Sequence, residues 1–169
     1  MTSTTATAID SLLESERGLT FASFDESVAW DLGTQLRARA ARDGLAVSIE
    51  IRQANGALLF QCALPGASAD TNAWAERKSA VALRFGESSA IVGERYASMR
   101  EYPIMATWID TTVYAPVGGS LLIRVLGTSI AVATASVSGL PGNGDHEFLV
   151  DGFRDFLTGN SGSTAGSRQ

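Results

Sequence analysis

A lysine on the hydrophobic side of its own helix is the first sign of a functional site in this sequence. The residues that recur at the spacing of one helical face are Trp74, Lys78, Val81 and Phe85. In one interpretation the Lys78 stem packs beside Trp74 while its ammonium reaches the helix edge. In the other, a pocket holds the ammonium, which binds a carboxylate or phosphate. The adjacent Arg77 either stacks on the indole or presents a planar fork to an anion.

A second group of polar residues, Ser88 and Ser89, lies where the following helix is predicted to begin. A hydroxyl at a helix start commonly accepts a hydrogen bond from an unpaired backbone amide. The same amides, with Arg77 and Lys78 nearby, would also bind a propionate, carboxylate or phosphate. Capping and anion binding therefore both stay open for this pair.

Asp145 and His146 stand at the predicted first turn of the last helix. The positive end of the helix dipole favours a neutral imidazole, which can serve as a ligand or a hydrogen-bonding group. The alternative is a surface histidine beside a capping aspartate. If the protein is an enzyme, His146 is the candidate catalytic residue, acting as a general acid or base.

The paired glycines Gly118 and Gly119 allow close approach of the backbone to a ligand or a neighbouring subunit, or they form a simple turn. Cys62 and His146 are each the sole residue of their type, so no metal site of clustered cysteines and histidines is expected. The sequence contains no P-loop, G-x-G-x-x-G, G-x-S-x-G or paired-histidine zinc motif. Standard catalytic signatures are therefore absent.

Composition narrows the class of protein. The 169 residues, 45% of them hydrophobic and 18% charged, are typical of one globular domain. A net charge of -5 without clustered lysine and arginine argues against nucleic-acid binding. No apolar run approaches the roughly 20 residues that span a bilayer, and the first residues do not resemble a signal peptide. We therefore expect a cytoplasmic protein that does not bind membranes.

Hydrophobic periodicity and turn residues predict where the helices and strands lie. The predicted helices cover residues 9–16, 23–44, 70–85, 88–99 and a last segment that Asn143 or Asp145 caps. The predicted strands cover residues 19–22, 47–51, 57–64, 121–125 and 130–137. Segment 106–114 is compatible with either a strand or a helix.

The order of these elements predicts the fold class. Hairpins are present, but no strand–helix–strand repeat, so we predict an α+β fold in which helices flank a mainly antiparallel sheet. Strands 121–125 and 130–137 are nearly continuous in apolar character and belong at the sheet centre. One domain covers residues 9–158, between small, polar ends at 1–8 and 159–169 that we expect to be unstructured.

Several separated blocks of the sequence resemble the GlcG/HbpS-like haem-degrading family, in particular its small uncharacterised proteins. The blocks are Asn72–Lys78, Phe85–Ser89, Gly118–Gly119, Val137–Pro141 and Asp145–His146. The resemblance spans about residues 12–157. It is moderately specific, because the Trp…Arg-Lys block and the Ser-Gly-Leu-Pro…Asp-His block occur in the same order.

The resemblance implies a profilin-like α/β/α sandwich, homo-oligomeric assembly and, in some relatives, binding or slow breakdown of haem. Similar sequences often carry a histidine just before the paired glycines, where this chain has Val117. The remaining side chains that could ligate haem iron are His146, Tyr96, Tyr102, Tyr114, Met99, Met105 and Cys62.

Three hypotheses for function follow. In the first, the protein is a homo-oligomer, at least a dimer, that binds a small anionic or planar molecule such as haem in a pocket between subunits. That pocket would be lined by Trp74, Arg77, Lys78, Ser88 and His146. In the second, His146 is the acid or base of an enzyme on a small-molecule pathway. In the third, the same residues build an interface for protein partners. Self-association is expected because segment 121–137 and the aromatic stripes offer more apolar surface than a small domain easily buries.

Overall fold

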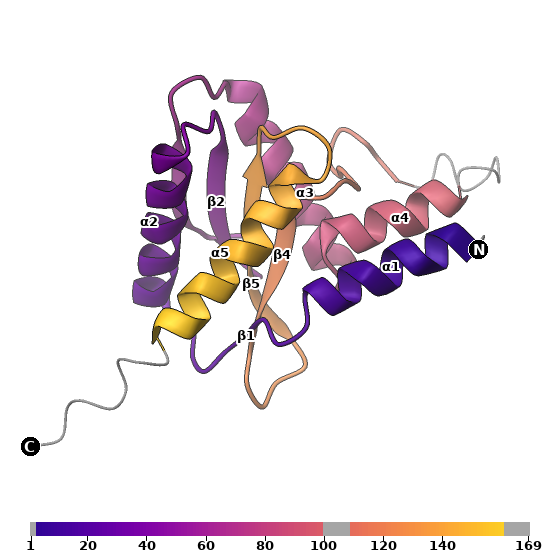
Figure 1. Ribbon diagram of the computed structural model, residues 1–169, viewed down its shortest axis with the longest axis horizontal. Helices are drawn as coiled ribbons and strands as arrows, with labels where there is room; N and C mark the ends of the chain where they lie inside the picture. The colour runs from indigo at the N-terminus through magenta and orange to yellow at the C-terminus, as the bar shows by residue number, and fades with distance from the viewer. Residues whose placement is uncertain (1–2, 100–108, 161–169) are drawn as a thin grey trace, which may run out of the picture.

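The computed structural model describes residues 3–99 and 109–160. Its helices are α1 (Ser3–Ser15), α2 (Glu26–Arg42), α3 (Ala69–Phe85), α4 (Ser89–Met99) and α5 (Gly144–Asn160). Its strands are β1 (Thr20–Phe21), β2 (Ser48–Gln53), β3 (Leu58–Ala63), β4 (Ser120–Val125) and β5 (Ala131–Ser138). Their arrangement is shown in Figure 1.

The strands form one sheet in the order β1-β4-β5-β2-β3. All neighbours pair antiparallel except the short β1, which runs parallel to β4. Helices α2 and α5 cover one face and α3 packs on the other, so the predicted α+β sandwich with a mainly antiparallel sheet is confirmed. Segments β4 and β5 lie at the sheet centre, as their apolar character indicated.

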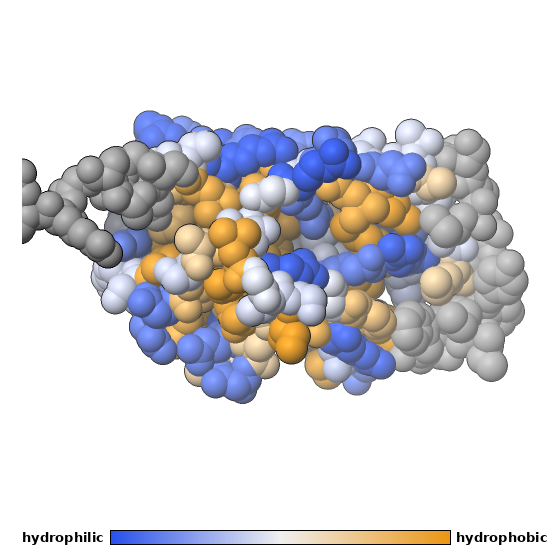
Figure 2. All heavy atoms as spheres, turned by 90° about the horizontal axis from the view of Figure 1, so that it is seen from below, coloured by the Kyte–Doolittle hydropathy of each residue, from blue (hydrophilic) through white to orange (hydrophobic). Residues whose placement is uncertain are grey.

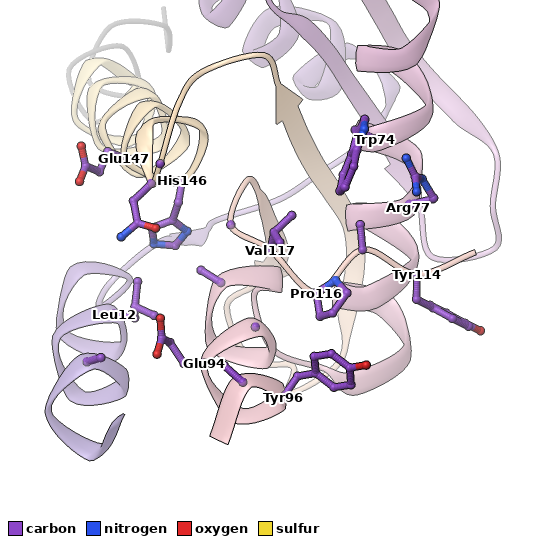
Figure 3. Close-up of a pocket in the computed structure, with 18 of the residues that line it drawn as sticks. Leu12, Trp74, Arg77, Glu94, Tyr96, Tyr114, Pro116, Val117, His146 and Glu147 are labelled. Carbon is purple, nitrogen blue, oxygen red and sulfur yellow. The ribbon is translucent and has the colours of Figure 1, made fainter. Parts of the chain in front are cut away.

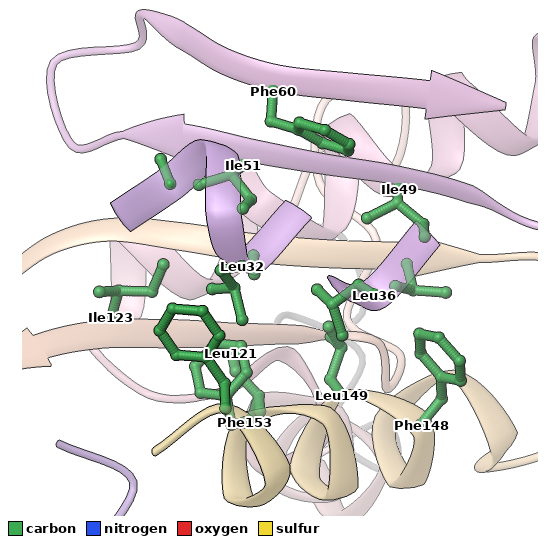
Figure 4. Close-up of a cluster of buried hydrophobic side chains, with 14 of the residues drawn as sticks. Leu32, Leu36, Ile49, Ile51, Phe60, Leu121, Ile123, Phe148, Leu149 and Phe153 are labelled. Atoms are coloured by element: carbon green, nitrogen blue, oxygen red, sulfur yellow. The ribbon is translucent and has the colours of Figure 1, made fainter. Parts of the chain in front are cut away.

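The hydrophobic core fills the space between the sheet and the α2–α5 layer. Figure 4 shows Leu32 and Leu36 of α2 and Phe153 of α5 lying against strand residues such as Ile49 and Ile123. These side chains alternate along each strand, because successive residues of a strand point to opposite faces. This layer lies on the face of the sheet opposite α3.

The opposite face, under α3, is lined by small polar residues rather than by the apolar ones expected for a central sheet. The hydroxyls of Ser79 and Thr134 lie 2.7 Å apart, and Ser136 donates to Ser120 over 2.8 Å. Ser48 and Thr71 hydroxyls are likewise 2.7 Å apart. Buried hydroxyls are tolerated here because each one pairs with another. This polar layer is also where the Lys78 side chain ends.

The helix ends correct several predictions. Helix α1 begins at Ser3, within the segment expected to be unstructured, because it packs along α4 and tertiary contact extends a weak helix. Asp25, not Ser23, caps α2 by accepting from Val28 N. Ser68 caps α3 two residues before the predicted Asp70.

The end of α3 and segment 106–114 were also predicted from the sequence. Gly86 ends α3 in the left-handed conformation at φ 68°, as predicted. Of segment 106–114, residues 106–108 lie outside the described part, and 110–113 form a turn around Asp110. Within residues 3–99 and 109–160, none of the helices combines the length and apolar character needed to cross a bilayer.

Candidate functional site

A cavity of about 960 Å³ lies where four helices meet the loop that precedes β4. Its walls come from α1, α3, α4, the first turn of α5 and residues 111–118, as Figure 3 shows. The larger side chains that line it are Leu12, Trp74, Arg77, Glu94, Tyr96, Tyr114, Pro116, Val117, Asn143, His146 and Glu147. An apolar pocket with a few polar groups is the usual form of a small-molecule site.

One wall of the cavity is a fixed pair of Trp74 and Arg77. The Arg77 guanidinium carbon lies 4.2 Å from the centre of the Trp74 ring, and the indole N–H donates to Asp70 over 3.1 Å. Arg77 also donates from Nη1 to the Thr111 carbonyl and from Nε to the Ala73 carbonyl. A guanidinium has five N–H donors, so the group retains capacity for a carboxylate. The stacking interpretation of Arg77 is therefore confirmed, and it leaves anion binding possible.

The only histidine of the chain forms the opposite wall. His146 is 3% exposed, so the alternative of a surface histidine is wrong. Within the described part of the chain, neither ring nitrogen has a hydrogen-bond partner. Burial lowers the pKa of His146 to about 4, so the ring is neutral at pH 7. The neutral form was predicted from the helix dipole, but desolvation is its cause here.

Sequence reasoning missed Glu16, which lies beside this histidine. The Ser88 hydroxyl donates to Glu16 Oε1 over 2.5 Å, and His146 Nε2 lies 3.7 Å from the same oxygen. Burial raises the pKa of Glu16 above its usual range. Nothing in the sequence marked Glu16, because it follows α1 and reaches Ser88 and His146 only through tertiary packing.

Lys78 is turned away from the cavity and fully buried in an ion pair. Its Nζ lies 2.6 Å from Asp145 Oδ2 and donates to the Val137 carbonyl over 3.1 Å. The second Asp145 oxygen accepts from the Leu140 amide over 2.9 Å. Burial lowers the pKa of Lys78, and the hydrogen bond to Asp145 opposes that shift. The ammonium thus ties α3 to the end of β5 and the start of α5, which neither interpretation of Lys78 anticipated.

Of the remaining predicted site residues, Gly118 lines the cavity and the others lie behind its wall. Ser88 also accepts from Ile91 N over 3.4 Å, so it helps to cap α4, whereas Ser89 accepts from Ser120 N over 2.9 Å. Gly118 lines the cavity, and Gly119 lies over the Lys78 pair. The structure therefore brings Trp74, Arg77, Gly118 and His146 to the cavity. It leaves Lys78, Ser88, Ser89, Gly119 and Asp145 as supporting residues.

The side chains considered as iron ligands separate in the same way. Tyr96, Tyr114 and His146 line the cavity. Cys62 is on β3, at the far edge of the sheet, and Met99 ends α4 without lining the cavity. Tyr102 and Met105 lie outside the described residues.

A side chain at Gly119 is expected to destabilise the fold. A Cβ at Gly119 would lie 2.6 Å from the Val137 carbonyl oxygen and 2.7 Å from Lys78 Nζ, and the backbone φ is +121°. Gly119→Ala is expected to lower the free energy of unfolding by at least about 2 kcal/mol, measured by urea denaturation. The control Gly127→Ala has φ +81° but nothing within 4 Å of the added Cβ, and we expect a loss of only about 1 kcal/mol. Equal losses in the two variants would contradict the steric argument.

Comparison with known proteins gives consistent results. The family model described as "Haem degrading protein HbpS-like" matches residues 24–154. A UPF0303 protein of Streptomyces coelicolor is 36% identical over 156 residues, covering 92% of this chain and 98% of that protein. The crystal structure of Ybr137w superposes with TM-score 0.81 and 28% identity, covering 90% of this chain and 89% of that one.

A more distant structure is a complex with haem. The crystal structure of the PduOC:heme complex superposes with TM-score 0.62 and 14% identity, covering 78% of this chain and 94% of that one. At this identity the likeness shows a shared fold alone.

Proposed function

The chain belongs to the HbpS-like haem-degrading family, and from this premise we propose that it is a homo-oligomeric protein that binds a small planar ligand in the α1–α3–α4–α5 cavity. Haem is the first candidate for that ligand. The family description and the haem complex of a protein with the same fold support this candidate. The observation that carries the proposal is the cavity itself, with its aromatic walls, the Arg77 guanidinium and the His146 imidazole, which has no hydrogen-bond partner among the described residues.

Size and wall chemistry suit a haem-sized molecule. The volume of about 960 Å³ lies within the roughly 300–1,000 Å³ typical of cofactor sites. Trp74, Tyr96 and Tyr114 offer aromatic surface for a conjugated ring. Arg77 would pair with a propionate, and Glu94 and Glu147 on other parts of the wall would repel one. These charges favour a single orientation of an anionic ring.

His146 fits the chemistry of an iron ligand. Its two ring nitrogens lack partners among the described residues, and a neutral imidazole is the form that ligates metals. Both nitrogens are shielded from solvent, so ligation requires the ring to turn towards the cavity, whereas binding to Trp74 and Arg77 needs no such change. Haem would supply redox chemistry at its iron. Val117, also on the wall, has no ligating atom.

The enzymatic hypothesis has less support from the same geometry. A general base works best when its pKa lies near the operating pH, and the pKa of His146 is about 4. Glu16, whose Oε1 lies 3.7 Å from His146 Nε2, already accepts a hydrogen bond from Ser88, which is 2% exposed. Binding is therefore the function that the site supports best.

A haem titration followed by the Soret absorption band tests the proposal. Arg77→Met is expected to weaken binding about 10- to 100-fold, because a charge-assisted hydrogen bond contributes about 1.5–3 kcal/mol. Trp74→Ala should weaken it about 10-fold by loss of ring contact. Arg42→Met, which removes a surface arginine paired with Asp43 far from the cavity wall, is the matched control and should bind normally.

The possible outcomes distinguish an error in the proposed site from an error in the proposed ligand. Unchanged affinity in both cavity variants would overturn the site, and no saturable Soret change in the unmodified protein would overturn haem as its ligand. His146→Ala tests iron ligation, because an imidazole that ligates the iron would shift the Soret band when it is removed, even if haem still bound. A band position that does not change would show that His146 does not ligate the iron.

A further inference from the structure

The outer edge of the sheet at β3 carries no charged residue. β3 ends the strand order, and its sequence is Leu-Leu-Phe-Gln-Cys-Ala. Soluble proteins usually protect such an edge with lysine, proline or a covering segment, because its free backbone groups pair with other strands. Leu58 of this strand is 45% exposed, and beside the strand Trp30 of α2 is 62% exposed. An uncharged edge with exposed hydrophobic neighbours is typical of an interface.

We propose that β3 pairs antiparallel with β3 of a second copy of this chain, about a two-fold axis, so that the two sheets become one. The inference rests on the self-association stated in the proposed function and names its surface. It does not involve the ligand cavity, because α1 and α4, which line that cavity, lie on the opposite side of the molecule from α2 in Figure 1.

The backbone alternation sets the register of this pairing. Leu64 N donates to Val47 O, so the backbone groups of Leu64 face β2. Backbone groups alternate between the two sides of a strand, so the amides and carbonyls of Cys62 and Phe60, two and four residues before Leu64, also face β2. The N–H and C=O groups of Gln61 and Ala63 consequently face outwards. The alternation is interrupted at Leu59, which is the extra residue of a β-bulge between the Ile51–Phe60 and Arg52–Leu58 pairs. A two-fold axis at Gln61 would pair Gln61 with its own copy. It would also place Leu59, at the bulge, opposite Ala63 of the second copy.

Helix α2 supplies side-chain complementarity for the same arrangement. It packs on β2 and β3, so the two copies of α2 would lie side by side and antiparallel on one face of the joined sheet. Trp30, whose ring centre is 5.8 Å from that of Phe60, would fill the space between them.

The charges of α2 favour this antiparallel contact with a copy of itself. Glu26 and Asp31 lie in its N-terminal half, whereas Arg37 lies in its C-terminal half. Arg37 is close enough to β3 to lower the pKa of Cys62, although burial raises that pKa more. A two-fold axis brings each acidic half to the basic half of the partner, and the helix dipoles then also oppose each other. A parallel contact would bring like charges together.

Site-directed crosslinking tests the register. In a Cys62→Ser background, Gln61→Cys is expected to form an interchain disulfide, because directly paired residues have Cα atoms about 5.5 Å apart, within the disulfide range. Leu59→Cys and Ala63→Cys should not crosslink alone, because each lies several residues from its own copy. An equilibrated mixture of these two variants should crosslink, and crosslinking of either one alone would overturn the register.

A second variant tests the surface by particle mass in light scattering. Gln61→Pro removes an outward N–H, which an edge strand tolerates, and it is expected to halve the mass of the assembly. Gln61→Thr keeps the N–H and should leave the mass unchanged. A proline variant that retains the full mass, without crosslinking of Gln61→Cys, would overturn this surface. An unmodified protein that is monomeric at all concentrations would overturn the self-association in the proposed function, whereas loss of haem binding with the dimer intact would overturn only the ligand.

Discussion

Replacing Lys78 with methionine is expected to lower the free energy of unfolding by about 3–5 kcal/mol, because it leaves the Asp145 carboxylate buried without its cation. Asp145 is 4% exposed and, among the described residues, would keep only the Leu140 amide as a partner. Methionine matches the lysine stem in size, so the lost free energy of unfolding comes from removing the charge and not from opening a cavity. The measurement is the urea unfolding midpoint followed by circular dichroism.

The matched control for Lys78→Met is Arg42→Met, which breaks an exposed ion pair with Asp43 and should cost less than about 1 kcal/mol. The double variant Lys78→Met/Asp145→Leu should recover part of the stability, because two apolar groups replace two buried charges. A loss in Lys78→Met no larger than that in Arg42→Met would show that the pair does not hold α3 and α5 together. Because this variant can weaken the whole fold, Lys78 is unsuitable for testing ligand binding.

Acidification is expected to destabilise the protein through His146 by about 3 kcal/mol between pH 7 and pH 4. In the unfolded chain a histidine titrates near pH 6.5, whereas burial lowers the pKa of His146 to about 4 in the fold. Between these values the unfolded chain binds a proton that the folded chain does not, so protons favour unfolding. The stability lost on acidification is restored as the pH rises above about 6.5.

Because Glu16 acts in the opposite direction, a variant must isolate the histidine. The raised pKa of Glu16 makes the folded state the better proton acceptor at that group, which stabilises the fold as pH falls. His146→Leu cannot take up this proton, so its stability should fall about 3 kcal/mol less than that of the unmodified protein over this range. Since His146 is the only histidine, its ring resonances in an NMR titration also give its pKa directly. A value near 6.5, or parallel stability curves, would contradict this assignment.

The secondary structure was largely accessible from sequence where one local signal dominated. The recurring apolar residues of 23–44 predicted α2, and Asn55-Gly56 predicted the turn of the β2–β3 hairpin. Helix starts were less accessible, because Ser, Thr and Asp residues near each start compete for the capping position. Ser68 and Asp25 cap helices for which other residues were predicted. The early start of α1 depends on α4, which no local pattern contains.

Hydrophobicity alone did not predict whether the apolar side chains of segment 121–137 are buried in the fold or exposed on its surface. Most of its large side chains are buried in the fold, and those exposed, Leu126 and Ile130, flank the turn between β4 and β5. This turn projects at the end of the molecule seen in Figure 2, where hydrophobic side chains gather between hydrophilic ones. Sequence reasoning overlooked the exposed Trp30 and the free β3 edge, because the strand order decides which strand lies at the edge.

The sequence by itself determined the family, the fold class and the types of residue that meet near the cavity, since these depend on periodicity and on blocks of neighbouring residues. Only the tertiary structure decided the partner of each functional group. Lys78 and Asp145 were both singled out from the sequence, but as ligand-binding residues, and they neutralise each other across 67 positions of the chain. Glu16 meets Ser88 across 72 positions. Burial and the direction of a side chain arise from packing between distant elements, and these two quantities decide whether a charged group binds a ligand or holds the fold together.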